Sequence, residues 1–206
     1  MPDQKTHWES IYQTKTPHQV SWYKPRLEKS IELIRGLGLS KEAQIIDIGA
    51  GASTLLDDLI AEGFRHITAL DISSAALKFS KGRLGNKIEC IGWIEADILR
   101  AELPSHHYDL WHDRALFHFL TEREDRLKYI RQLEVSLKPG GYLLMATFGP
   151  NGPPKCSGLP IVRYSSESLP QELGAPFQLQ QHSTEVHTTP FDTTQEFLYC
   201  LFRKAP

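Results

Sequence analysis

The residues best placed to bind a charged ligand lie in one short segment, residues 45–54. In this segment Asp47 is followed, two residues apart, by Gly49 and Gly51. Glycines permit backbone conformations and a close ligand approach that a Cβ would block, and a helix that follows them presents unpaired N–H groups. The carboxylate of Asp47 would attract a cation and repel a pyrophosphate. The segment therefore predicts a binding site for a cofactor that carries positive charge.

The elements that must position this segment are a buried strand and an amphipathic helix. The apolar run 43–48 is short, as is typical of a central parallel strand, and residues 55–60 have helical periodicity. Strands and helices then alternate. The last two predicted strands, 177–186 and 195–202, have no helix between them, which indicates a terminal antiparallel hairpin. We predict an α/β fold.

Two further carboxylates end the next two predicted strands. Asp71 ends the second strand, where an acid can accept hydrogen bonds from ribose hydroxyls. Its alternative role is to cap the next helix, although Ser73 or Ser74 can do this instead. Asp97 ends the third strand, and its alternative is a loop carboxylate in solvent. Acids at successive strand ends favour a ligand site at that edge of the sheet.

A nicotinamide-dependent oxidoreductase would share the glycine turn and Asp71. However, a dinucleotide site requires G-x-G-x-x-G, and Thr54 stands in place of the third glycine. Asp47 and the terminal hairpin also disfavour this class. An ordinary turn between a strand and a helix, without a ligand, is the other interpretation of a lone Gly-x-Gly.

The sequence Asp-x-Gly-x-Gly at 47–51 resembles motif I of the class I S-adenosylmethionine (SAM)-dependent methyltransferases, whose cofactor carries an ammonium and a sulfonium. The resemblance spans nearly the whole chain and is strongest over 45–148, where Lys-Pro-Gly-Gly at 138–141 precedes an apolar strand. It implies one domain over 1–206, with a Rossmann-like, doubly wound, seven-stranded mixed sheet of order 3-2-1-4-5-7-6 and a C-terminal antiparallel hairpin.

The resemblance also implies which residues hold the cofactor. In the family, the acid at the place of Asp71 binds the ribose, and the acid at the place of Asp97 meets the adenine amino group. The implied cofactor-binding residues of the strand ends and the glycine turn are Asp47, Gly49, Ala50, Gly51, Asp71, Ile72, Asp97 and Ile98.

The first 24 residues are aromatic without clear periodicity. Trp8, Tyr12 and Trp22 resemble the N-terminal arm of the elongation-factor lysine methyltransferases, which folds over the cofactor. We expect the arm, 1–24, to contribute these three side chains to the cofactor site, the alternative being surface packing. The glycine- and proline-rich segment 149–160 is expected to be a lid-like loop.

The polar cluster after the fourth predicted strand supplies the catalytic candidates His112, Asp113 and His118. Asp113 is preferred as a base because Asp113-Arg114-Ala115-Leu116 resembles the Asp-Lys-Gly-x element of the elongation-factor lysine methyltransferases. Arg114 and Ala115 depart from that element. A structural, hydrogen-bonded histidine is the alternative for His112.

These observations predict an enzyme that moves the methyl group of SAM to a small-molecule acceptor. Positioning supplies most of the catalysis in such a reaction, so no universal catalytic residue is expected. Transfer to a protein lysine is the alternative. From other classes, a nicotinamide-dependent oxidoreductase and a catalytically silent SAM-binding module remain.

Composition disfavours several partners. The chain has 206 residues and a net charge of −2, which gives no reason to expect nucleic acid or a membrane surface. No apolar run approaches the roughly 18 residues of a membrane span, and residues 1–7 lack the apolar core of a signal peptide. Three distant cysteines favour a reduced, cytoplasmic protein. His112, His182 and His187 lie on separate predicted strands, so no metal site is expected.

Overall fold

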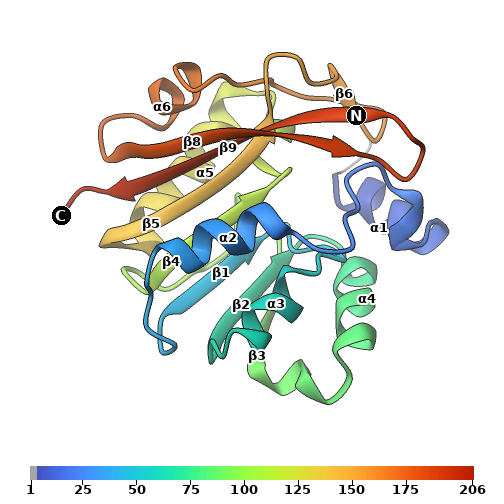
Figure 1. Cartoon of the computed structure of the whole chain (residues 1–206), viewed down its shortest axis with the longest axis horizontal. Coiled ribbons are helices and arrows are strands. Elements are labelled where there is room, and N and C mark those ends of the chain that lie inside the picture. Colours follow the sequence, from blue (N-terminus) through green and yellow to red (C-terminus); the bar gives the residue numbers. More distant parts are fainter. Residues whose placement is uncertain (1–3) are drawn as a thin grey trace.

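A seven-stranded sheet forms the centre of the computed structural model, which describes residues 4–206 (Figure 1). The first three residues of the expected arm lie outside this range. The sheet strands are β1 (Gln44–Ile48), β2 (His66–Asp71), β3 (Ile91–Glu95), β4 (Tyr108–Arg114), β5 (Leu137–Phe148), β8 (Phe177–Thr188) and β9 (Thr194–Lys204).

The strand order is β3-β2-β1-β4-β5-β9-β8, which confirms the predicted topology. The numbers differ from 3-2-1-4-5-7-6 only because β6 (Lys155–Cys156) and β7 (Leu159–Pro160) form a separate two-stranded hairpin. The first five sheet strands are parallel, whereas β9 runs antiparallel to both β5 and β8. The chain order reverses between β1 and β4, and ligands bind at the carboxyl ends of the strands at such a point.

Helices cover both faces of the sheet (Figure 1). The α-helices are α1 (Gln4–Thr14), α2 (Glu28–Gly36), α3 (Leu55–Ala61), α4 (Ser74–Leu84), α5 (Arg123–Ser136) and α6 (Ser168–Leu173), and the 3₁₀ helices are η1 (Pro17–Gln19), η2 (Gly85–Cys90) and η3 (Phe117–Phe119). Among the helices of residues 4–206, none has the length and apolar character needed to cross a bilayer.

Strand β1 shows how the sequence fills both layers. Ile45 packs with α2 and α3 on one face, and Ile46 and Ile48 pack with α5 on the other. All three are fully buried. This two-sided burial is expected for a central parallel strand, and it fixes the position of the glycine turn that follows.

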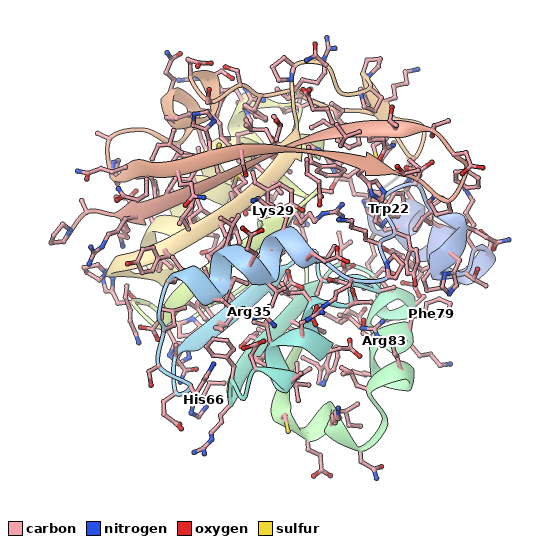
Figure 2. All side chains as sticks on the ribbon, in the orientation of Figure 1. Trp22, Lys29, Arg35, His66, Phe79 and Arg83 are labelled. Atoms are coloured by element: carbon pink, nitrogen blue, oxygen red, sulfur yellow. The ribbon has the colours of Figure 1, made fainter. Side chains whose placement is uncertain are left out.

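The arm contains a helix that the sequence interpretation missed. Trp8 and Tyr12 lie four residues apart on α1, and both contact Trp22 edge to face. Phe79 of α4 lies on the side facing this helix (Figure 2), with its ring 6.5 Å from that of Tyr12. The side chain of Glu9 accepts hydrogen bonds from residues 73–75 at the start of α4. Tertiary contacts therefore stabilise a helix whose own sequence has only a weak apolar stripe.

Candidate functional site

The glycine turn has a conformation that requires glycine. Gly49 and Gly51 have φ values of 66° and 49°. A Cβ on Gly49 would lie 2.8 Å from Cδ1 of Leu116, and a Cβ on Gly51 would lie 2.7 Å from the hydroxyl oxygen of Tyr12. Both clashes point toward the space between the turn, the arm and the end of β4. The turn is therefore a cradle that a side chain would fill.

Asp47 belongs to a buried hydrogen-bonded chain beneath this turn. His112 donates from Nδ1 to Oδ1 of Asp47 over 2.6 Å, and Nε2 of His112 is 3.0 Å from the hydroxyl of Ser30. The other carboxylate oxygen, Oδ2 of Asp47, is buried and has no hydrogen-bond partner among residues 4–206. An unpaired buried carboxylate oxygen is costly, and it suits an ammonium group supplied by a ligand.

Asp71 is fixed by backbone donors from two elements. Gly51 donates to Oδ2 and Ser73 donates to Oδ1, each over 2.8 Å. Burial raises the pKa of this carboxyl to about 6, although these hydrogen bonds oppose the shift. Ser73, not Asp71, caps α4, because its side chain accepts from the N–H of Ala76. The carboxylate therefore remains available to a ligand.

Asp97 lies after β3 and is held by the N–H of Leu99, 2.9 Å from Oδ1. The apolar side chains of Ile72 and Ile98 line the same space. These apolar side chains lie between the carboxylates of Asp71 and Asp97. This arrangement suits a flat heterocycle attached to a sugar, because the polar edge of the heterocycle and the hydroxyls of the sugar would each meet a carboxylate acceptor.

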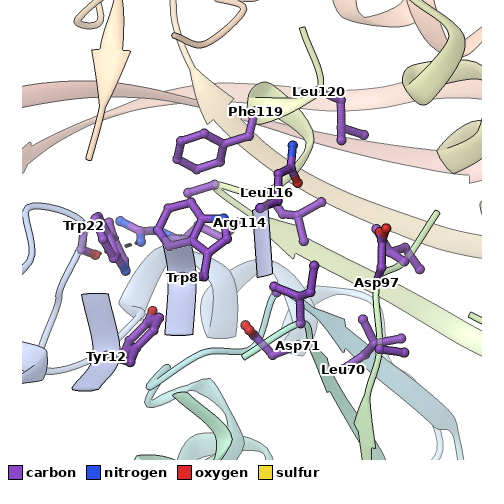
Figure 3. Close-up of a pocket in the computed structure, with 16 residues that line it drawn as sticks. Trp8, Tyr12, Trp22, Leu70, Asp71, Asp97, Arg114, Leu116, Phe119 and Leu120 are labelled. Atoms are coloured by element: carbon purple, nitrogen blue, oxygen red, sulfur yellow. Dashed lines mark hydrogen bonds between the residues drawn. The ribbon is translucent and has the colours of Figure 1, made fainter. Parts of the chain in front are cut away.

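Two adjoining cavities bring these residues together. The strand-end cavity has about 740 Å³ of empty space including its open mouth, a size typical of small-molecule sites. The residues predicted to bind the cofactor that line this cavity are Trp8, Tyr12, Trp22, Gly49, Asp71, Ile72, Asp97 and Ile98 (Figure 3). The glycine-loop cavity is lined by Tyr12, Trp22, Asp47, Gly49, Ala50, Gly51 and His112 among the predicted residues. Each of the eleven predicted cofactor residues therefore lines one cavity or both.

Asp113 does not reach either cavity. It is fully buried, and it accepts hydrogen bonds from the N–H groups of Leu116 and Phe117 and from the hydroxyl of Tyr129, the last over 2.5 Å. Burial raises its pKa to about 6. Asp113, the preferred candidate for the base, lies on the α5 face of β4, and its hydrogen bonds hold the turn after β4.

The two histidine candidates are also engaged. Both ring nitrogens of His112 are hydrogen-bonded, to Asp47 and Ser30. His118 is fully buried, and its Nδ1 accepts from the N–H of Phe148. Burial, helped by the charge of Arg114, lowers the pKa of His118 to about 3. His118 lines neither cavity. Neither ring offers a free lone pair to a substrate, which argues against both as general bases.

Arg114 belongs to the polar cluster after the fourth predicted strand, and it also departs from the Asp-Lys-Gly-x element, in which a lysine stands at this place. It ends β4 and lines both cavities. Its Nε donates to the hydroxyl of Tyr199 and its Nη1 to the carbonyl of Trp22, each over 3.0 Å. Its guanidinium lies 4.3 Å from the centre of the Phe197 ring. The signal available in the sequence was a cation at the end of a strand otherwise followed by apolar residues.

The remaining histidines and the expected lid lie elsewhere. His187 donates to the carbonyl of Ser21, and His182 lies five residues earlier in β8. Across residues 4–206, no three His, Cys, Asp or Glu side chains form a group suited to a metal ion. The segment 149–160 lines neither cavity, and Glu196 of β9 holds it by accepting from Asn151.

Known proteins are similar in sequence to the central region of this chain, which includes residues 46–145. The family model described as a methyltransferase domain matches residues 46–145. Malonyl-[acyl-carrier protein] O-methyltransferase of Paenibacillus sp. is 31% identical over 130 residues, which cover 61% of this chain and 46% of that protein. EEF1A lysine methyltransferase 2 of Danio rerio is 25% identical over 127 residues, covering 59% and 54% respectively. The chain thus spans about half the length of these curated relatives.

The fold is similar over a longer range. The crystal structure of Burkholderia thailandensis 1,6-didemethyltoxoflavin-N1-methyltransferase, with bound 1,6-didemethyltoxoflavin and S-adenosylhomocysteine, superposes with a TM-score of 0.75 at 17% identity. The match covers 98% of this chain and 88% of that one. Residues 46–145 therefore resemble a methyltransferase domain in sequence, and nearly the whole chain has the class I fold of SAM-dependent methyltransferases.

Proposed function

We propose that this protein transfers the methyl group of SAM to a small-molecule acceptor. The observation that carries the proposal is the pair of adjoining cavities, in which Asp47, Asp71 and Asp97 surround one glycine cradle. This donor set fits SAM: Asp97 would meet the adenine amino group, Asp71 the ribose hydroxyls, and Oδ2 of Asp47 the ammonium. The bound cofactor supplies an electrophilic methyl group on a sulfonium.

The chain's own residues act mainly by positioning and by excluding water. Trp8 contacts Trp22 and Phe119 edge to face, with ring centres 5.6 Å and 4.9 Å apart, and these rings close the strand-end cavity on the side of the arm (Figure 3). Orientation alone can supply roughly 7–11 kcal/mol of rate enhancement. We infer that the arm both orients the reactants and keeps water from them.

A small acceptor is favoured because the arm encloses the site. The strand-end cavity has aromatic walls formed by Trp8, Trp22 and Phe119, which suit a small, partly apolar acceptor. A protein lysine is the second candidate, supported by the similarity to EEF1A lysine methyltransferase 2. The similarity to a toxoflavin-pathway N-methyltransferase that binds a small heterocycle favours the first.

Two measurements test the proposal. Titration calorimetry with S-adenosylhomocysteine and with NAD should give binding for the first and none for the second. A screen with labelled SAM against small thiols, amines, hydroxyl compounds and carboxylates, and against folded proteins, should label a small molecule. Tight NAD binding without S-adenosylhomocysteine binding would overturn the cofactor. Label found only on a folded protein would replace the acceptor class, and binding without any transfer would indicate a catalytically silent module.

A further inference from the structure

The charge of Arg114 is not matched by a direct partner of opposite charge. Its hydrogen bonds go to a hydroxyl and a carbonyl, both neutral, and its Nη2 is buried without a hydrogen-bond partner among residues 4–206. Glu185 is the nearest carboxylate in this network, reached through the hydroxyl of Tyr199. That carboxylate already pairs with Lys24, whose Nζ lies 2.5 Å from its Oε1.

A buried guanidinium without a partner of opposite charge costs free energy, unless a ligand supplies an anionic hydrogen-bond acceptor for Nη2. Removing a charge from water carries a large penalty that only hydrogen-bonded pairing offsets. The remaining nitrogen, Nη2, carries N–H donors that form strong, charge-assisted hydrogen bonds to an anionic oxygen such as that of a carboxylate. The contacts with Tyr199, Trp22 and Phe197 hold the guanidinium in place, so Nη2 is presented in a fixed orientation.

The position of the guanidinium separates it from the adenosine end of the site. Asp71 and Asp97 come from β2 and from the segment after β3, whereas the partners of Arg114 come from β9 and the arm. Figure 3 shows Arg114 beside Trp22, across the cavity from Asp97. In the sheet, β4 lies between these two halves. Arg114 therefore faces the half in which the acceptor must lie.

The three candidates for a general base also bear on the kind of acceptor that the site can take. None of His112, Asp113 and His118 offers a free lone pair to the cavities. An acceptor whose methylated atom is a carboxylate oxygen has already lost its proton at neutral pH. The O–CH3 bond then forms as the S–CH3 bond breaks, S-adenosylhomocysteine leaves as a neutral sulfide, and no base is needed.

We propose that the acceptor is a small carboxylate with a flat, aromatic body, and that Arg114 binds its carboxylate through Nη2. Trp8, Trp22 and Phe119 form the apolar walls against which the ring stacks. This proposal rests on the proposed methyltransferase function and narrows its substrate class. Arg114 is a specificity-determining residue in this scheme, since it contacts the substrate but does not move a proton.

The test uses benzoate and benzamide, which share a ring and differ in charge. With the protein saturated with S-adenosylhomocysteine, benzoate should bind at least tenfold more tightly than benzamide and should shift the Nε–Hε NMR signal of Arg114. Arg114→Met should weaken benzoate binding at least tenfold and leave benzamide within twofold. The NMR signal of Arg114 is identified by its absence from the spectrum of Arg114→Lys. Because lysine keeps the positive charge, this variant should retain part of the preference for benzoate over benzamide. It also serves as a second variant should the methionine variant fail to fold.

Arg203→Met is the matched control, because Arg203 also lies over an aromatic ring and is on β9, yet lines neither cavity. It should leave both affinities unchanged. Equal binding of benzoate and benzamide by the unaltered protein, or binding of neither, overturns the proposal while S-adenosylhomocysteine binding persists. Loss of S-adenosylhomocysteine binding itself would overturn the proposed function instead.

A second arm of the experiment asks whose carboxylate Arg114 binds, because the amino-acid part of the cofactor also carries one. Methylthioadenosine lacks that part. If Arg114→Met weakens S-adenosylhomocysteine at least tenfold and leaves methylthioadenosine unchanged, the carboxylate is the cofactor's and the acceptor assignment is wrong. Unchanged affinity for both supports the acceptor assignment.

Discussion

Asp71 and Asp113 are two forms of one arrangement. Each lies at the carboxyl end of a parallel strand, each accepts two backbone N–H groups, and burial raises the pKa of each to about 6. They differ in what lies beyond them. Asp71 lines the strand-end cavity, whereas Asp113 is closed off by the hydroxyl of Tyr129, which in turn accepts from Trp111. A raised pKa alone therefore does not distinguish a carboxyl group that can meet a ligand from one that is structural; Asp71 differs from Asp113 in its access to a cavity.

The largest expected effect concerns the open carboxylate. Asp71→Ala should weaken S-adenosylhomocysteine binding by about 1–3 kcal/mol, because ribose hydroxyls would lose their acceptor in a buried site. Titration calorimetry measures this change. Glu124→Gln, at an exposed position of α5, is the control and should bind normally. Unchanged affinity in the Asp71 variant would remove the contrast between the two acids.

The closed carboxylate should affect stability instead. Asp113→Asn should lower the free energy of unfolding by about 1–2 kcal/mol, since it disturbs a buried network in which Tyr129 already accepts from Trp111. Urea denaturation measures the loss, and calorimetry should find S-adenosylhomocysteine affinity within twofold of normal. Full stability combined with lost turnover on the identified acceptor would restore Asp113 as a catalytic group.

Acid should separate the two carboxylates further. Ribose hydroxyls donate to an ionised carboxylate, and the pKa of Asp71 is raised to about 6 in the free protein. Affinity for S-adenosylhomocysteine should then be constant above pH 7 and fall about tenfold between pH 7 and pH 5, because binding must first remove a proton. Asp71→Asn should abolish this slope, and Asp113→Asn should not. A slope that persists in Asp71→Asn would assign it to another group.

The pH dependence of folding stability has the opposite sign to that of ligand binding, for both Asp71 and Asp113. Both carboxyls have a raised pKa in the folded state, so each contributes most stability below about pH 4 and progressively loses it as the pH rises toward 6. Asp113→Asn should reduce this slope in thermal denaturation followed by circular dichroism. An unchanged slope would mean that the pKa of Asp113 is not raised.

The smallest expected effect concerns the segments that surround the open site. If the arm and the segment 149–160 close over bound reactants, S-adenosylhomocysteine should slow hydrogen exchange several-fold in both, because ordering follows contacts made only in the bound state. Exchange near Tyr129 should not change. Protection confined to the glycine turn would show that the arm packs in the same way without ligand.

Residues near each other in sequence were well predicted. The glycine turn follows from a short local motif, whereas the strand order was implied by the family resemblance and is confirmed; the cofactor roles of the acids at the strand ends stay predictions. The orientation of residues at the end of β4 is harder to predict, because the strand alternates between faces: Asp113 contacts Tyr129 of α5, whereas Arg114 contacts Trp22 of the arm. Which of two adjacent residues meets the cavity depends on Tyr199, 85 residues away, and no local pattern reports that contact. Helix α1 was missed for the same reason, since its stabilising partners are on α4.

The arm is synthesised before strands β8 and β9, which carry several of its partners. Ser21 is held by His187, Lys24 by Glu185, and Trp22 by an arginine that itself depends on Tyr199. During translation, the glycine turn and its acids can therefore fold while the arm still lacks these contacts, and the cavity closes only after β9 has left the ribosome and inserted beside β5. A nascent chain would therefore expose the glycine turn and its acids before the arm covers them. The addition of β9 to the sheet is the step that encloses the cavity.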